Sequence, residues 1–414
     1  MQFLERTLYS QLKKHLSQPE ISLILGPRQA GKTTLMLKLA EELTRKNQAT
    51  AFFNLDVLED KQFFQTQHTL LDRVKQIAGN QKTVVFIDEV HRLENAGLFL
   101  KGLYDLQSPH KFVVSGSGSL ELKANIIEPM TGRKKIFSCL PLSFTEFAAN
   151  RLVADFEKVS AILKTNPHEE RRLVNEYLTY GGYPRVVLSP THQEKVETLT
   201  EIYQSYLERD IELLLKVEKT AAFQNLVKLL ANQVGGLVNR AQLSSALGVT
   251  QRTVTKYLSL LEKTFVVALV PPFYKSARRE LTRSPKVYFL DLGLLHLAQG
   301  RLPLAPTAVE GGLFENACFL RLKELDLLEP PHFWRTKTGA EVDFIISSPR
   351  TGEAIPIEVK ISQKKAETVG KGLISFMKKY HPWQTFIYTQ EQSEEIEKFG
   401  HRIIYLPFSQ LPKV

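Results

Sequence analysis

The sequence predicts an α/β protein built of several domains, and three observations support this class. Near the N-terminus, a glycine-rich phosphate-loop signature joins a strand-like apolar run to an amphipathic helical pattern. Apolar, β-branched runs then alternate with helical patterns, as a parallel sheet covered by helices requires. Further on, short apolar runs that carry carboxylates indicate a second α/β unit. We expect a phosphate-loop domain at 1–150, a helical unit at 151–215, a helix-turn-helix unit at 216–285 and a C-terminal α/β domain at 286–414.

The phosphate loop is the most specific motif in the chain. Residues 26–33 read G-x-x-x-x-G-K-[ST], between an apolar run at 21–25 and a helical pattern at 34–40. In this order, backbone N–H groups and a helix N-terminus converge on phosphate. Lys32 would reach the β- and γ-phosphates of a nucleoside triphosphate, and the Thr33 hydroxyl would hold Mg²⁺. The expected nucleotide-binding residues here are Gly26, Pro27, Arg28, Gln29, Ala30, Gly31, Lys32, Thr33 and Thr34.

Two adjacent acids end a later strand pattern. The run at 83–87 is apolar and β-branched, as in a strand buried on both faces, and Asp88 and Glu89 follow it. Two acids at a strand end are common, but after a phosphate loop they are the expected second half of the site. Asp88 would hold Mg²⁺ through water, and Glu89 would polarise the attacking water.

Two further groups each leave an alternative open. After the strand pattern at 111–114, the run Ser-Gly-Ser-Gly-Ser at 115–119 places hydroxyls at the same sheet edge, with Ser117 as the candidate for the γ-phosphate. The run could equally be a glycine–serine turn. Arg133, before a strand pattern at 135–139, is a candidate to sense phosphate charge in its own subunit or across a subunit boundary. A surface arginine at a turn explains it as well.

Together these segments resemble the prokaryotic AAA-like ATPases of the ASCE division. The resemblance rests on the phosphate loop, the Phe-Ile-Asp-Glu-Val-His box at 86–91, the Ser-Gly-Ser run, and Gly132-Arg133 followed by residues 140–147. It implies a five-stranded parallel P-loop sheet in which another strand separates the Asp88 strand from the phosphate-loop strand. It also implies ATP and Mg²⁺ as cofactors, with Glu89 as the catalytic glutamate.

The middle of the chain is predicted to be helical, and residues 180–184 (Tyr-Gly-Gly-Tyr-Pro) must form a turn within it. The resembling ATPases carry a similar turn in a helical lid over the nucleotide, which makes Arg185 a candidate nucleotide-facing cation. A helical hairpin without chemistry is the alternative.

Residues 239–258 read as a helix-turn-helix, and the apolar run at 265–273 suits the wing of a winged helix. The residues expected to face outward from the second helix are Gln251, Arg252, Thr255 and Lys256. Winged helices bind DNA or contact proteins, so both roles stay open.

The charge pattern favours a polyanion in one place. Lysine and arginine number 54 against 44 acidic residues, a formal net charge of +10, and an excess of this size can be a solvated surface. A cluster near the wing, in which Glu280 is the one acid, suits a polyanion partner better. Its basic residues are Lys275, Arg278, Arg279, Arg283 and Lys286.

A second candidate site lies in the C-terminal part. Asp343 on one apolar strand pattern, with Glu358 and Lys360 at i and i+2 of another, makes a D…E-x-K set. Two carboxylates can hold a metal and the lysine can steady a hydroxide or phosphate, with Glu315 completing the metal shell. The set resembles the PD-(D/E)XK phosphodiesterase core, which implies an αβββαβ fold and a second Mg²⁺ or Mn²⁺. The alternative is a fold retained for binding, in which the acids and the lysine form a salt-bridge network.

Composition sets the remaining expectations. The 414 residues are 43% hydrophobic and 24% charged, as in globular chains of two or three domains. Cys139 and Cys318 lie among apolar neighbours, so a reducing compartment is expected. The N-terminus lacks the apolar core of a signal peptide, and no apolar run approaches the ~20 residues that cross a bilayer. We expect a cytoplasmic protein without a membrane partner.

The leading hypothesis is Mg²⁺-dependent ATP hydrolysis, used as a motor or switch on DNA, with a metal-dependent nuclease domain as a candidate addition and a homo-oligomer as a candidate assembly. The alternative is a nucleotide-controlled signalling or defence switch in which the nuclease-like domain is a scaffold.

Overall fold

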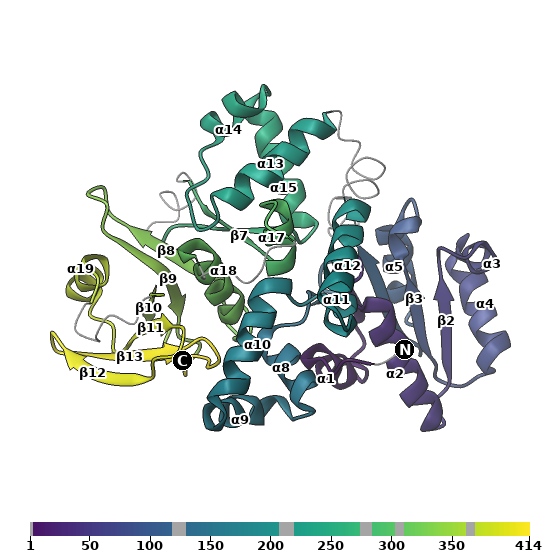
Figure 1. Cartoon of the computed structure of the whole chain (residues 1–414). Coiled ribbons are helices and arrows are strands. Elements are labelled where there is room, and N and C mark those ends of the chain that lie inside the picture. The colour runs from purple at the N-terminus through teal and green to yellow at the C-terminus, as the bar shows by residue number, and fades with distance from the viewer. Residues whose placement is uncertain (1–2, 118–129, 207–218, 274–283, 303–309, 362–368) are drawn as a thin grey trace.

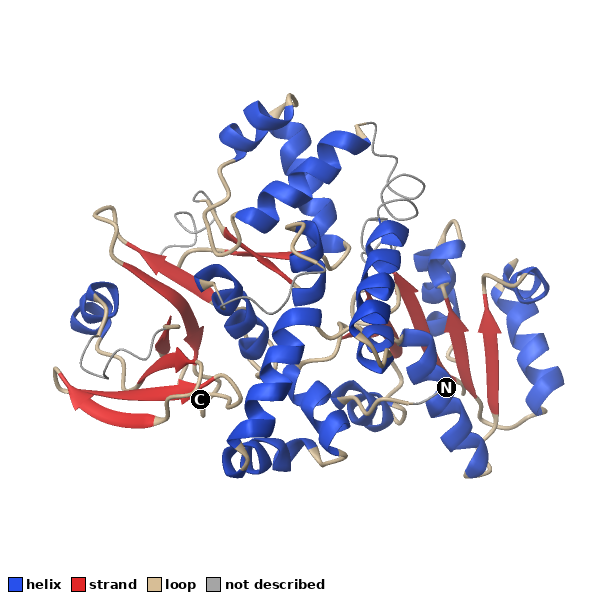
Figure 2. Cartoon of the chain, viewed as in Figure 1, coloured by secondary structure: helices blue, strands red, loops and turns tan. Residues whose placement is uncertain are grey.

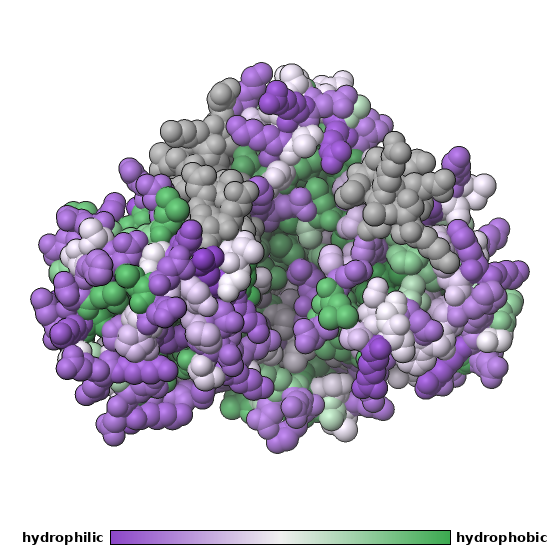
Figure 3. Space-filling view, turned by 180° about the vertical axis from the view of Figure 1, so that it is seen from behind, coloured by the Kyte–Doolittle hydropathy of each residue, from purple (hydrophilic) through white to green (hydrophobic). Residues whose placement is uncertain are grey.

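The computed structural model describes residues 3–117, 130–206, 219–273, 284–302, 310–361 and 369–414, and it leaves out the side chain of Ser117. Two sheets lie at opposite ends of the molecule, and helices fill the space between them (Figures 1 and 2). Seen from behind, hydrophilic side chains cover most of the surface, and hydrophobic ones show mainly near the middle (Figure 3).

The N-terminal sheet is parallel, with the strand order β2-β3-β4-β1-β5. Its strands are β1 (Ile21–Gly26), β2 (Thr50–Asn54), β3 (Val84–Asp88), β4 (Lys111–Ser117) and β5 (Lys134–Ser138). β4 lies between β1 and β3, so the strand that ends in Asp88 is separated from the phosphate-loop strand. This confirms the predicted fold class for the N-terminal part of the chain.

Helices bury both faces of this sheet. They are α1 (Thr7–His15), α2 (Lys32–Arg45), α3 (Leu58–Lys61), α4 (Gln67–Ala78) and α5 (Ala96–Asp105), with short 3-10 helices at Gln62–Phe64 and Val90–Arg92. Successive residues of β3 enter different cores: Phe86 packs with the residues of α1 and α2, and Val85 with those of α4 and α5. A strand covered on both sides has no polar face, which explains the continuous apolar run.

A helical unit connects the two sheets. Its helices are α8 (Phe144–Leu152), α9 (Val159–Thr165), α10 (Pro167–Tyr180), α11 (Pro184–Leu188) and α12 (His192–Ser205), with a 3-10 helix at Phe156–Lys158. α8 begins with a capping box between Ser143 and Glu146. α10 begins with the Asn166 side chain as its cap and Pro167 in the first turn, where proline lacks only an unused donor.

The next unit contains α13 (Thr220–Asn232), α14 (Arg240–Leu247), α15 (Gln251–Lys263), β6 (Val267–Val270) and β7 (Lys286–Phe289). The side chains of Asn239 and Thr250 cap α14 and α15. Gly248 joins the two helices with φ +62°, a conformation that glycine adopts without strain. β7 pairs antiparallel with β6, so this two-stranded sheet spans the boundary predicted at 285/286. The assignment as a winged helix stays a prediction.

The C-terminal sheet has the order β12-β13-β11-β10-β9-β8. Its strands are β8 (His332–Arg335), β9 (Glu341–Ser347), β10 (Ala354–Val359), β11 (Thr385–Thr389), β12 (Glu394–Lys398) and β13 (His401–Pro407). The helices nearby are α17 (Leu292–Ala298), α18 (Gly311–Leu322) and α19 (Lys371–Tyr380). α18, β8–β10, α19 and β11 follow in the order helix, three strands, helix, strand, with β8–β10 antiparallel and β11 parallel to β10.

A buried arginine joins this sheet domain to the helical unit. Arg321 of α18 is 1% exposed and donates through Nε to the Phe408 carbonyl (3.0 Å) and through Nη1 to the Thr145 hydroxyl of α8 (2.9 Å). Its guanidinium lies 5.2 Å from the Phe144 ring centre. A buried charge of this kind is held only where acceptors surround it, so these contacts fix the domain on α8.

Among the described residues, no helix is long and apolar enough to cross a membrane.

Candidate functional site

The phosphate loop connects β1 to α2 through two left-handed residues, Gln29 (φ +60°) and Gly31 (φ +96°). Lys32 begins α2, is 5% exposed, and donates through Nζ to the carbonyls of Gly26 (3.1 Å) and Pro27 (2.8 Å). The ammonium is therefore held at the mouth of the loop by two neutral acceptors. Phosphate oxygens would be stronger partners for it, because hydrogen bonds between charged groups are roughly twice as strong.

The predicted metal ligands of the first site lie together. The Thr33 hydroxyl donates to Asp88 Oδ2 at 2.7 Å, and the Ser115 hydroxyl donates to Asp88 Oδ1. Burial raises the pKa of Asp88 above its usual value, although the hydrogen bonds from Ser115 and Thr33 oppose the shift. A hydroxyl and a carboxylate are oxygen ligands of the kind that Mg²⁺ prefers. Thr33, in the first turn of α2, and Asp88, at the end of β3, therefore fit that ion.

Glu89 reaches the same space because of its backbone. Successive side chains of a strand point to opposite faces, but Glu89 has φ +57°, a left-handed conformation that turns the chain after Asp88. Its backbone N–H donates to Ser115 Oγ at 3.2 Å, and its Oε2 lies 2.9 Å from His91 Nδ1. Burial raises the pKa of Glu89, but the hydrogen bond and charge of His91, with Lys32 and Arg28, outweigh it and leave the pKa below its usual value. The carboxylate is thus held ionised, as a general base requires.

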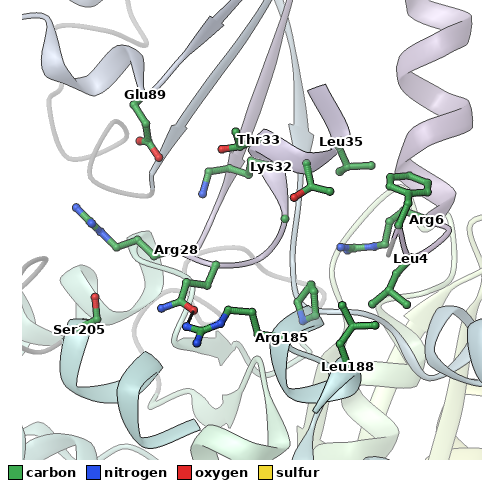
Figure 4. Close-up of a pocket in the computed structure, with 15 residues that line it drawn as sticks. Leu4, Arg6, Arg28, Lys32, Thr33, Leu35, Glu89, Arg185, Leu188 and Ser205 are labelled. Carbon is green, nitrogen blue, oxygen red and sulfur yellow. Dashed lines mark hydrogen bonds between the residues drawn. The ribbon is translucent and has the colours of Figure 1, made fainter. Parts of the chain in front are cut away.

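Lys32, Thr33 and Glu89 line a cavity of about 360 Å³. In Figure 4 the head groups of Arg28, Lys32 and Glu89 face a common space, while Arg185 and Leu188 approach from the helical unit. Leu4 and Leu35 lie at the opposite end of this space, beside Arg6 (Figure 4), and Phe3 also lines the cavity. A charged end and an apolar end together suit a molecule that has phosphates and a base.

Arg6 connects the N-terminal segment, which includes Leu4, to the phosphate loop. Its buried guanidinium donates to the Ala30 carbonyl (3.1 Å), the Leu140 carbonyl (2.6 Å) and Glu146 Oε2 (3.0 Å). Burial alone would lower the pKa of Arg6, but the charge of Glu146 outweighs it and the pKa lies above its usual value. Arg6 therefore fixes the N-terminal segment against the loop that is expected to bind phosphate.

The predicted turn at 180–184 lies over the phosphate loop. A Cβ added to Gly31 would lie 3.7 Å from Pro184 Cγ, and Arg185 donates to Gln29 Oε1 at 2.8 Å. Asp291 holds the turn from the other side, because its Oδ2 accepts from the Gly182 N–H at 2.8 Å and its Oδ1 from the Leu294 N–H at 2.9 Å. Burial raises the pKa of Asp291 to about 6, although these backbone hydrogen bonds oppose the shift.

Most of the predicted nucleotide-binding residues come together. The ones that line the cavity are Arg28, Gln29, Gly31, Lys32, Thr33 and Thr34. Ala30 is buried behind the loop, and Gly26 and Pro27 are buried and present their carbonyls to Lys32. Ser117 is the last residue of β4, opposite Gly26, and its side chain lies outside the described residues. Ser115, two residues earlier on β4, donates its hydroxyl to Asp88 Oδ1.

Arg133 is not brought to the cavity. Its carbonyl accepts from the N–H of Ile21 at 2.9 Å, and Ile21 begins β1, whereas the phosphate loop follows the end of β1. Its guanidinium donates to Asp105 at 2.8 Å. Arg133 therefore lies at the amino ends of the strands, opposite the phosphate loop, and does not contact the site in its own chain. A role across a subunit boundary stays a prediction.

The residues of the second predicted site also lie close together. Asp343 of β9 accepts from the Val359 N–H at 2.8 Å, which places it beside Glu358 of β10, and Lys360 Nζ lies 2.7 Å from Glu358 Oε1. Burial and the charge of Glu315 raise the pKa of Asp343, and burial and the charge of Asp343 raise the pKa of Glu358. For Lys360, burial lowers the pKa but Glu358 outweighs it, and the pKa lies above its usual value.

A second lysine occupies this cluster, and sequence reasoning did not place it there. Lys286 Nζ lies 2.9 Å from Glu315 Oε1, 2.6 Å from Glu341 Oε1 and 3.9 Å from Asp343 Oδ1. Burial would lower the pKa of Lys286, but these carboxylates outweigh it and hold the pKa above its usual value. Within the described part of the chain, no group of three or more His, Cys, Asp or Glu side chains is arranged to hold a metal ion. Lys286 thus lies beside two of the predicted metal ligands, Glu315 and Asp343, and the second metal site stays a prediction.

The predicted outward residues of the helix-turn-helix are on the surface. Gln251, Arg252, Thr255 and Lys256 of α15 are exposed, whereas Val254 and Leu258 on its other face are buried. Of the predicted basic cluster, Lys286 is described and buried. Lys275, Arg278, Arg279 and Arg283 lie outside the described residues.

The strand order, the phosphate loop and the Thr33–Asp88 pair define the N-terminal domain as an AAA-like P-loop ATPase domain that binds ATP. In agreement, residues 18–148 match the model of a family described as an AAA domain. Residues 171–304 and 310–411 match two families, each described as a domain of unknown function.

Three relatives that match most of the chain are each described as an uncharacterized protein. One from Mycobacterium tuberculosis is 26% identical over 362 residues, which cover 86% of this chain and 73% of the relative. One from Haemophilus influenzae is 26% identical over 315 residues, covering 73% and 74%. One from Methanocaldococcus jannaschii is 24% identical over 336 residues, covering 79% and 72%.

Solved structures give distant matches. The replication initiator DnaA bound to AMPPCP and single-stranded DNA is 12% identical, with a TM-score of 0.29 and coverage of 64% of this chain and 89% of that chain. The S. cerevisiae Hsp104–ADP complex is 14% identical, with a TM-score of 0.32 and coverage of 63% and 39%. Both are too distant to indicate a shared activity.

Proposed function

We propose that this protein hydrolyses ATP with Mg²⁺ and uses the nucleotide state as a motor or switch that acts on DNA. The observation that carries the ATPase part is the meeting of Thr33, Asp88 and Glu89 at one sheet edge beside Lys32. When bound there, Mg²⁺ would neutralise charge on the β- and γ-phosphates. Thr33 and Asp88 would hold the ion, Lys32 would hold the phosphates, and Glu89 would orient a water and accept its proton.

The turn over the phosphate loop supports the switch. Arg185 contacts Gln29 of the loop, and Gly182, three residues earlier, is bound to the buried Asp291. Gly182 also accepts from the Leu142 N–H at 2.7 Å. A Cβ at Gly182 would lie 2.1 Å from the Leu142 carbonyl oxygen, so the turn packs too closely on Leu142 for any residue larger than glycine. If a phosphate replaced Gln29 as the partner of Arg185, the turn at 180–184 would shift. That turn is hydrogen-bonded to Leu142 on one side and to Asp291 on the other, so the shift would reach both parts of the chain.

Two features support DNA as the partner. α15 exposes Arg252 and Lys256 from a helix-turn-helix arrangement, and its N-terminus is capped and free of acidic residues in the first turn. Four residues of the basic cluster, Lys275, Arg278, Arg279 and Arg283, lie between β6 and β7 in the sequence. Positive side chains on one helix and in a nearby stretch of sequence are the electrostatic pattern of a phosphate-backbone contact.

The test is DNA binding by the full chain in three nucleotide states. Labelled single- and double-stranded DNA would be titrated with the protein and Mg²⁺, without nucleotide, with ADP and with a non-hydrolysable ATP analogue. We expect the Kd for DNA to change with the analogue in the wild type and to be insensitive to it in Lys32→Ala. An identical Kd in all three states of the wild type would contradict the proposal.

A second candidate function is a nucleotide-controlled signalling or defence switch, in which the ATP state governs assembly and the C-terminal domain is a scaffold. The position of Lys286 among Glu315, Glu341 and Asp343 favours the scaffold over a nuclease. Nucleotide-dependent assembly without DNA binding would support it. In a subunit assembly, Arg133 would exchange its contact with Asp105 for a phosphate of a neighbouring subunit's nucleotide.

Cleavage itself is tested with Asp343→Ala. If the C-terminal domain is a nuclease, this change should abolish metal-dependent DNA cleavage and leave ATPase activity intact, because Asp343 belongs to a sheet separate from the phosphate loop. If the domain is a scaffold, the wild type should cleave no form of DNA with Mg²⁺ or Mn²⁺.

A further inference from the structure

The Lys286 ammonium is surrounded by acids from two other elements. Lys286 is the first residue of β7 and is 2% exposed. Its Nζ lies 2.9 Å from Glu315 Oε1 of α18 and 2.6 Å from Glu341 Oε1 of β9. Asp343 Oδ1, on the same face of β9, is 3.9 Å away. One buried cation thus lies among three carboxylates that are brought together by the fold.

The surroundings fix this arrangement. Tyr288, on the same face of β7, donates its hydroxyl to Glu315 Oε1 at 2.5 Å, and the Phe333 ring centre lies 5.6 Å from Lys286 Nζ. A Cβ added to Gly235 would lie 3.1 Å from Glu315 Oε2, so a larger residue there would crowd the carboxylate. Tyr288 and the close packing at Gly235 therefore hold Glu315 beside Lys286.

This geometry leaves no room for a divalent ion at the same point. Mg²⁺ requires near-octahedral oxygen ligands at roughly 2.0–2.1 Å and keeps several waters. An ammonium already fills the space between Glu315 and Glu341, and a second cation beside it would meet a repulsion of a few kcal/mol even at an effective dielectric constant of about 20.

We propose that Lys286 is the resident cation of this carboxylate cluster and takes the place that a divalent metal would occupy. By doing so it ties β7 to α18 and to the six-stranded sheet. Removal of its charge should turn the cluster into a divalent-cation site formed by Glu315, Glu341 and Asp343. The inference deepens the scaffold role proposed above for the C-terminal domain, and it does not depend on ATP hydrolysis or DNA binding.

The experiment uses the full chain without nucleotide and measures MnCl₂ binding by titration, together with the unfolding temperature. We expect Lys286→Gln to bind Mn²⁺ at least about tenfold more tightly than the wild type, and Lys286→Gln/Asp343→Asn to lose the gain. Asp88 and Glu89 are present in every variant, so weak binding at the other site cancels in the comparison.

Lys111→Gln is the matched control. Lys111 also begins a strand and is 3% exposed, but its ammonium donates to the carbonyls of Gln18 and Glu20 instead of to a carboxylate cluster. It should lower the unfolding temperature without a gain in Mn²⁺ affinity. A folded Lys286→Gln that binds Mn²⁺ no better than the wild type overturns the proposal.

Loss of a buried cation can prevent folding, because it leaves carboxylates unpaired. If Lys286→Gln does not fold, Mn²⁺ binding by the wild type is compared with binding by Asp343→Asn to test the proposal. Mn²⁺ binding by the wild type that Asp343→Asn abolishes would overturn the proposal, whereas equal responses of these two proteins would support it. DNA binding and ATPase activity are measured separately, so their failure is not confused with this result.

Discussion

The hydroxyl of Thr33 donates a 2.7 Å hydrogen bond to the carboxylate of Asp88, a residue 55 positions further along the chain. Thr33 is in the first turn of α2, after β1, and Asp88 ends β3. β4 lies between the two strands, and all three run parallel, so their carboxyl ends meet at one edge. The two oxygens that are expected to share Mg²⁺ are therefore already in contact.

We predict that Glu89→Gln retains ATP binding but loses turnover by a factor on the order of 10² or more, because an amide cannot accept the proton of the attacking water. Steady-state ATPase activity and binding of a fluorescent nucleotide would measure the two effects. Glu94→Gln, at an exposed position nearby, is the control and should behave as wild type. Lys32→Ala should instead lose binding. Normal turnover in Glu89→Gln would remove Glu89 from the mechanism.

Ser115→Ala should weaken both the site and the fold. The change leaves Asp88 Oδ1 without its serine donor and removes the acceptor of the Glu89 N–H. We expect a loss of about 1–2 kcal/mol in the free energy of unfolding and a roughly tenfold fall in kcat/KM for ATP. Denaturant unfolding and ATPase assays would measure these. Ser10→Ala, at an exposed position in α1, should change neither.

Replacement of Arg252 and Lys256 by alanine should weaken DNA binding and flatten its salt dependence by about two units of slope, because each lost phosphate contact releases one fewer counterion. Anisotropy titrations over a range of salt concentrations would measure the slope. Arg45→Ala/Lys46→Ala removes the same two charges from exposed positions at the C-terminal end of α2 and is the control. An unchanged slope would assign α15 to protein contact.

The free energy of unfolding should depend on pH through Asp291, which holds the turn over the phosphate loop. Its folded pKa of about 6 is above the ordinary value of 3.8, so protonation favours the folded state. The resulting stability is present in full below pH 3.8 and is lost as the pH rises through about 6.

Asp291→Asn cannot titrate, so the difference in unfolding free energy between it and the wild type should change between pH 4 and 7, in favour of the wild type at the lower pH. Urea unfolding at several pH values would measure this difference. A difference that is constant over the range would contradict the raised pKa of Asp291.

The first site was predictable because its signals are local. A phosphate loop needs glycine at fixed positions and lysine and threonine at the start of a helix, so residues 26–33 specify it by themselves. The acids after a buried strand are also read locally. Ser117 stays a prediction for the γ-phosphate. The contact of Ser115 with Asp88 could not be predicted from local sequence, because strand register decides which hydroxyl meets the acid.

The sequence by itself determined the phosphate loop, the strand that ends in Asp88 and Glu89, and the capped helices α14 and α15, because each depends on neighbours a few residues away. Only the tertiary structure decided that Arg6 would brace the Ala30 carbonyl, that Asp291 would hold the Gly182 turn, and that Lys286 would lie among the acids of α18 and β9. Those contacts join residues far apart in the chain. A buried charged side chain meets its partners only when packing has brought their helices and strands together. The local sequence around that side chain therefore does not indicate which residues its partners are.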